Sequence, residues 1–184
     1  MPAKTAHAGL YSLKAVARIC AQPFFLWAIR MRYWLMKSEP DEVSIDDVLA
    51  APRHTVAWFG VRNYQARNFM RDGMQEGDLA FFYHSSCAEP GIAGIVEVAS
   101  GAYPDATQFD PGSHYYDAKA TPEQPRWISV DVKALRKTRL LSLKELRSCP
   151  ELEGMRLLAK GSRLSVMPVE AAEWKFIEQR LAKA

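Results

Sequence analysis

The feature that most limits the fold is a pair of apolar segments, LAFFYH at residues 79–84 and GIAGIVEVA at residues 91–99. Both are short, rich in residues that favour strands and preceded by turn-forming residues, which predicts two β-strands. Gly94 inside the second segment indicates a bulge or a close approach of another part of the chain. The chain must therefore build a sheet.

Further strand and helix patterns are interspersed along the sequence. Strands are predicted at residues 32–37, 56–59, 126–135 and 162–169, and helices at residues 44–51, 63–72, 141–149, 151–160 and 170–182. Ser44 and Asp47 form a capping-box pattern, Asn63 is a good N-cap and Gly73 a good C-cap. About six strands with helices between them predict an α+β domain, a small curled sheet or barrel of mixed strands surrounded by helices.

The charge is unevenly distributed over the 184 residues. Lys and Arg total 24 and Asp and Glu 21, and the first 30 residues hold four of the bases and no acid. The remainder therefore carries 20 bases against 21 acids and is not a generally basic protein. If it binds nucleic acid, it must use a local patch.

Residues 1–30 differ in composition from the rest. Lys14 and Arg18 interrupt the apolar pattern of a signal peptide, and the segment FFLWAI (24–29) is too short to cross a bilayer. A targeting peptide is one interpretation of this acid-free leader. We favour an upstream start or an accessory, poorly ordered extension, with one functional domain over residues 31–184.

Cysteine and histidine spacings argue against a metal site. Cys20, Cys87 and Cys149 are far apart, and the four histidines show no HExxH or HxH pattern. The sequence therefore predicts no disulfide framework, no metal and no cofactor, and a reducing compartment.

The segment VAWFGVRNYQARNFMR (56–71) combines flat rings with many hydrogen-bonding heads. In one interpretation Trp58 is a wall of a stacking site, and the start of the helix binds a phosphate. The side chains that would contact bases or backbone are Arg62, Asn63, Arg67, Asn68 and Arg71. In the other interpretation Trp58, Phe59, Phe69 and Met70 are core and the arginines are a solvated face.

Polar residues follow two of the strands. Lys37, Ser38 and Glu39 either line the mouth of a cleft or form a turn that ends at Pro40. His84 and Ser85 lie at another strand end, where they could hydrogen-bond a ligand. A Ser-His nucleophile is disfavoured because no GxSxG motif is present. The segments YPDATQFD (103–110) and SHYYD (113–117) either close over a pocket or form a surface loop with packing tyrosines.

Seven blocks in order resemble the EVE domain family: YWLMKSEPD, WFGVRNYQARNFMR, GDLAFFYHS, GIAGIVEV, YPD, RW and GSRLSVMPV. The resemblance covers essentially all of residues 31–184 and is specific, because several multi-residue blocks match. It implies a PUA-like pseudo-barrel that holds one modified nucleobase, for example methylated or hydroxymethylated cytosine, flipped from DNA or RNA into an aromatic-walled pocket.

Carried onto this sequence, the resemblance implies a base-binding site on which Tyr103 to Asp105 form a lid. Its residues are Lys37, Ser38, Glu39, Trp58, Gly60, Val61, Arg62, Asn63, Arg67, Asn68, His84, Ser85, Tyr103 and Asp105. We expect a non-catalytic monomer that contacts no membrane, in the bacterial cytoplasm or the eukaryotic nucleus. The alternatives are an amidohydrolase acting on modified nucleosides, with Lys37 and Glu39 as base and acid, and a small-molecule-binding module.

Overall fold

The computed structural model describes residues 32–182. The extension predicted for residues 1–30 lies outside this range and stays a prediction.

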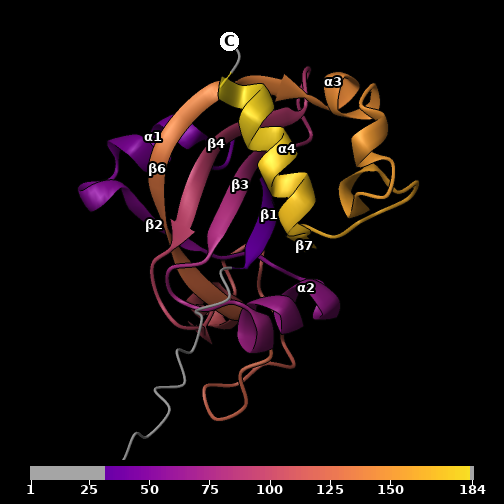
Figure 1. Ribbon diagram of the computed structural model, residues 1–184. Helices are drawn as coiled ribbons and strands as arrows, with labels where there is room; N and C mark the ends of the chain where they lie inside the picture. The colour runs from indigo at the N-terminus through magenta and orange to yellow at the C-terminus, as the bar shows by residue number, and fades with distance from the viewer. Residues whose placement is uncertain (1–31, 183–184) are drawn as a thin grey trace, which may run out of the picture. The chain divides into compact units, whose positions relative to one another are not determined.

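A curved mixed sheet forms the centre of the domain (Figure 1). Its strands are β1 (Tyr33–Ser38), β2 (Thr55–Trp58), β3 (Leu79–His84), β4 (Gly91–Val98), β5 (Tyr103–Pro104), β6 (Ile128–Ser142) and β7 (Val166–Val169). The order is β2-β6-β4-β3-β1-β7, and β5 pairs with β6. Because β1 and β3 are parallel while the other pairs are antiparallel, the mixed α+β fold expected from the sequence is confirmed.

Four α-helices surround the sheet, namely α1 (Ile45–Ala50), α2 (Tyr64–Asn68), α3 (Leu143–Arg147) and α4 (Ala171–Ala182). The capping box of Ser44 and Asp47 at α1 is confirmed, and the Asn63 side chain accepts from two backbone N–H groups at the start of α2. The chain then makes a π-turn over Phe69–Gly73 instead of ending at a Gly73 cap.

The sheet buries both of its faces, which explains the apolar run at residues 79–84. Phe82 belongs to a core with Trp58 and α1, whereas Phe81 belongs to a second core with α4. In the second core the Trp174 ring stacks on Phe81 at 4.0 Å and on Tyr33 at 4.6 Å. Alternate side chains of one strand thus enter two different cores.

Three elements differ from the sequence prediction. Strand β6 continues seven residues beyond the expected end at 135, because its pairing with β4 resumes after two register shifts. The expected helix at 151–160 is replaced by two 3₁₀ turns, Pro150–Leu152 and Arg156–Leu158. Strand β5 and the 3₁₀ turn Ala106–Phe109 lie in the segment expected to be a loop.

The close approach predicted at Gly94 is confirmed, since a Cβ there would lie 2.6 Å from the Ile45 side chain.

Candidate ligand pocket

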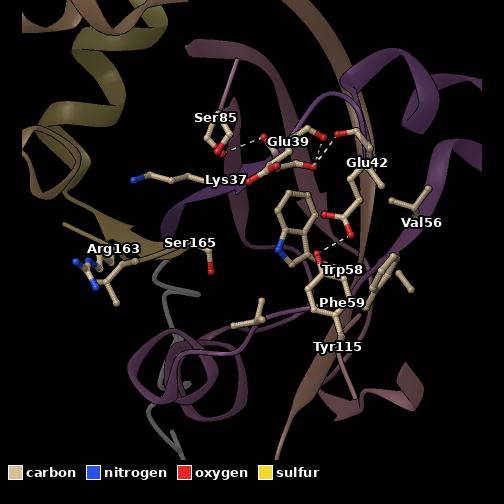
Figure 2. A pocket seen from close by; sticks show the side chains of 17 residues that line it. Lys37, Glu39, Glu42, Val56, Trp58, Phe59, Ser85, Tyr115, Arg163 and Ser165 are labelled. Carbon is tan, nitrogen blue, oxygen red and sulfur yellow. Dashed lines mark hydrogen bonds between the residues drawn. The ribbon is translucent and has the colours of Figure 1, made fainter. Parts of the chain in front are cut away.

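A cavity of about 350 Å³ opens where the parallel strands β1 and β3 end (Figure 2). Ser38 and His84 are register partners at these strand ends, and Ser85 N donates to Ser38 O at 2.8 Å. The lining comes from five separate parts of the chain, residues 37–39 with 42–43, 56–61, 85–86, 115 and 163–165. Parallel strand ends meeting at one edge bring these distant segments together.

Three aromatic side chains contribute to the walls. Trp58 lies at the centre of the view in Figure 2, is 6% exposed, and packs edge-on against Phe82 at 5.4 Å. Phe59 and Tyr115 pack edge to face at 5.9 Å, and Phe59 is 39% exposed. The cavity therefore offers flat apolar surface together with polar groups from the adjoining loops.

Gly60 permits the close approach of Tyr115. It has a φ of 78°, and a Cβ at this position would lie 2.7–2.9 Å from Tyr115 ring atoms. Its N–H donates to Asp105 Oδ2 at 2.9 Å. The Gly60 backbone and the Tyr115 ring thus form one contact that any larger residue at position 60 would disturb.

The buried carboxylate of Asp105 ties this wall to the long loop. It accepts from Gly60 N, from Arg62 Nη1 at 2.8 Å, and from both N and Oγ1 of Thr107. Burial opposes ionisation of Asp105, but the hydrogen bonds from Thr107, Arg62 and Gly60 outweigh burial and hold the pKa of this carboxyl below its usual value.

Arg62 connects Asp105 to Tyr115. Its Nε donates to Tyr115 O at 2.9 Å, and its guanidinium carbon lies 5.3 Å from the Tyr115 ring centroid and 5.4 Å from that of Trp127. Gln108, which is fully buried, bonds the backbone of Asp105, Arg126 and Trp127. The loop that carries Tyr115 is therefore fixed by side chains on both of its sides.

The polar side chains of the lining carry both charges. Burial lowers the pKa of Lys37, whose ammonium lies 5.9 Å from the Tyr83 ring centroid. Glu42 Oε1 accepts from the Tyr115 hydroxyl at 2.6 Å. Burial, followed by the bond to Glu42, raises the pKa of Tyr115 to about 12, so the phenol keeps its proton at neutral pH.

Half of the residues predicted for the site line the cavity. These are Lys37, Ser38, Glu39, Trp58, Gly60, Val61 and Ser85. The other predicted residues lie outside the lining. These are Arg62, Asn63, Arg67, Asn68, His84, Tyr103 and Asp105.

The residues outside the lining have structural partners of their own. His84 Nε2 accepts from Ile45 N at 3.2 Å, and burial lowers the pKa of this histidine. The Tyr103 hydroxyl donates to Asp131 at 2.6 Å from strand β5. The lid expected at residues 103–105 is thus a paired strand followed by the buried Asp105, because β5 pairs with β6.

Sequence analysis missed several lining residues, notably Glu42, Arg163 and Ser165. It treated Phe59 only as core, although this side chain is one of the exposed large apolar residues. Tyr115 lies in the segment 113–117, for which a pocket cover and a surface loop were both considered, and its side chain lines the cavity. The signal for the others was weak, because single polar residues in loops carry no periodicity.

Residues 32–182 contain no cluster of three or more potential metal ligands. None of their helices has the length and apolar character of a segment that spans a bilayer.

The model of the EVE domain family matches residues 32–180. The chain belongs to the EVE domain family. Among curated relatives, human thymocyte nuclear protein 1 is 42% identical over 163 residues, which is 79% of this chain and 72% of the human protein. The resemblance stated from the sequence is thereby confirmed.

Solved structures of EVE domain relatives share the fold of this EVE domain. A Pseudomonas syringae protein is 54% identical, covers 80% of this chain and 98% of its own, and has a TM-score of 0.77. Human THYN1 protein, solved in complex with 5-methylcytosine-containing DNA, is 42% identical, with coverage of 83% and 99% and a TM-score of 0.77.

Proposed function

We propose that this EVE domain is a non-catalytic module that binds nucleic acid by holding one modified cytosine in the pocket at the ends of β1 and β3. The observation that carries the proposal is the complex of the 42% identical human relative with 5-methylcytosine-containing DNA. The pocket supports it, because Trp58, Phe59 and Tyr115 supply flat surfaces and the loops supply polar groups. We place the module in the bacterial cytoplasm or the eukaryotic nucleus, acting as a monomer.

The energetics favour a single base over a long duplex contact. Removing a base from its stack costs a few kcal/mol, and stacking on an aromatic side chain returns about 1–3 kcal/mol per base. Acids and bases nearly balance in residues 31–184, which argues against a nucleic-acid affinity that comes only from attraction to the phosphate backbone. Selectivity must then come from the pocket.

The test is fluorescence anisotropy with short DNA and RNA strands that differ only in one central base. We expect binding of a 5-modified cytosine to be tens of times tighter than that of plain cytosine. Trp58→Ala should weaken binding of the modified strand roughly 5–150-fold, because it removes about 1–3 kcal/mol of stacking. Melting curves verify that the variant is folded. Equal affinity for all bases would contradict the proposal, and turnover of N-acylated cytidines would favour the amidohydrolase alternative.

We propose that Arg67 contacts the backbone of a bound strand. Its guanidinium lies 4.8 Å from the ring centroid of Tyr64, which is 49% exposed, and its hydrogen bonds go to Asn68 and to the Arg126 carbonyl. No acidic group of residues 32–182 forms a salt bridge with it. This cation is therefore available to a phosphate.

Arg67→Ala should weaken binding about equally for all bases and reduce the slope of log K against log salt concentration by about 1. Titrations at several salt concentrations measure both quantities. Arg156→Ala is the matched control, because it removes the same charge from an exposed residue outside the pocket. Equal effects of the two variants would show that Arg67 acts only through net charge.

A further inference from the structure

We infer that Glu42 reads the group at position 4 of the bound pyrimidine, so that the pocket accepts 4-amino bases of the cytosine type and rejects 4-oxo bases such as thymine and uracil. The inference rests on the proposed function and adds a specificity-determining residue to it. It also assigns a role to Tyr115, which positions Glu42.

The Glu42 carboxylate has one oxygen engaged and one oxygen free. Oε1 accepts from the Tyr115 hydroxyl, and within residues 32–182 Oε2 accepts no hydrogen bond. Figure 2 shows the Glu42 side chain reaching from the loop after β1 toward Tyr115, beside Trp58. An ionised carboxylate only accepts hydrogen bonds, so its free oxygen requires a donor from a ligand.

The hydrogen bond from Tyr115 sets Glu42 apart from the other carboxylate of the lining. The Glu39 side chain makes no hydrogen bond within residues 32–182, so nothing there fixes its rotamer. Tyr115 itself is held by Arg62 at its carbonyl and by contact with Gly60. A carboxylate that is fixed before binding loses less entropy when a ligand arrives, which favours Glu42 as the reader.

The chemistry of the bases requires such a reader. Thymine and 5-methylcytosine carry the same methyl group at C5, so apolar contact with that methyl cannot distinguish them. They differ at position 4, where cytosine presents an N–H₂ donor and thymine an oxygen acceptor. They also differ at N3, which is an acceptor in cytosine and carries a proton in thymine. A pocket that selects a methylated cytosine in DNA must therefore read position 4 or N3, and a carboxylate acceptor can read the donor at position 4.

A carboxylate both favours a 4-amino base and rejects a 4-oxo base. It accepts a hydrogen bond from the 4-amino group, whereas a 4-oxo group placed against it leaves two acceptors facing each other without a proton. Glu42 is exposed to solvent, so water solvates its carboxylate when no base is bound. A bound base excludes this water, and an unmatched pair then costs the full desolvation of both groups.

The experiment compares Kd values for two pairs of single strands, one pair with a central 5-methylcytosine or thymine and one with a central cytosine or uracil. The wild-type protein should prefer the 4-amino base at least tenfold in both pairs. Glu42→Gln should reduce both ratios about tenfold or more, because the amide can donate to a 4-oxo group. Asp41→Asn is the control, since it removes the same charge from an exposed neighbour outside the lining and should leave both ratios unchanged.

Tyr115→Phe provides a second variant that keeps the ring and releases Glu42. It should lower the same ratios while retaining binding of both bases, which a merely structural role of Tyr115 would not produce. The inference would be overturned if Glu42→Gln kept the wild-type ratios of Kd between 4-oxo and 4-amino bases. The proposed function would remain intact if the wild type still preferred 5-methylcytosine over cytosine. A wild-type protein that binds all four bases equally would overturn both.

Discussion

Asp105→Ala should lower the free energy of unfolding by about 3–5 kcal/mol, the range for removing one partner of a buried ion pair. Asp105 is 1% exposed; its loss leaves the N–H groups of Gly60 and Thr107 without an acceptor and removes the ionic partner of Arg62. Urea unfolding monitored by tryptophan fluorescence measures the change. Glu123→Ala, at an exposed position of the same long loop, should stay within about 0.5 kcal/mol.

The acid limb of the stability curve gives an independent check on Asp105. Because its folded-state pKa is lowered, the carboxylate contributes stability that is fully present above its unfolded pKa of about 3.9 and is lost as pH falls through the lower folded value. The difference in stability between wild type and Asp105→Ala should therefore be constant above about pH 5 and shrink below about pH 4. A difference that stays constant down to pH 2 would show that the ion pair is not its source.

Local patterns of the sequence predicted the local structure well. The capping box at Ser44, the N-cap at Asn63 and the apolar strand at residues 79–84 depend on neighbours within a few positions, and all are confirmed. The close approach at Gly94 was also predictable locally, because a glycine interrupts a strand pattern. The side chain that fills the space beside Gly94 belongs to Ile45, on a helix distant in the sequence. Family resemblance then supplied the fold, which no local pattern fixes.

The orientation of polar side chains could not be obtained in this way. Arg62 and Asp105 are 43 residues apart, and Tyr115 and Glu42 are 73 apart. Arg62, Asp105 and Tyr115 lie in segments that the sequence pattern singles out, and Glu42 lies just outside one of them. Whether each side chain faces the cavity or supports a wall depends on sheet pairing. Arg62 and Asp105 were therefore assigned to ligand contact although they lie outside the lining, and Glu42 was not singled out.

Gly60→Ala tests whether the position of Tyr115 matters for binding. A Cβ at residue 60 would lie within 2.9 Å of the Tyr115 ring, so the ring must move. We expect affinity for the modified base to fall about tenfold or more, because the displaced ring takes with it the hydrogen bond to Glu42. The free energy of unfolding should fall by about 1–2 kcal/mol because alanine is strained in the left-handed region, and by about 1–3 kcal/mol more because its Cβ collides with the ring.

Gly77→Ala separates these two effects in the same protein. Gly77 has a φ of 91°, and no atom within 4 Å would meet its Cβ, so this variant carries the backbone strain without the collision. It should lose stability but keep wild-type affinity and base preference in the anisotropy assay. If Gly60→Ala also kept both, the pocket would tolerate a displaced Tyr115, and base selection would have to reside in Trp58 and the strand ends.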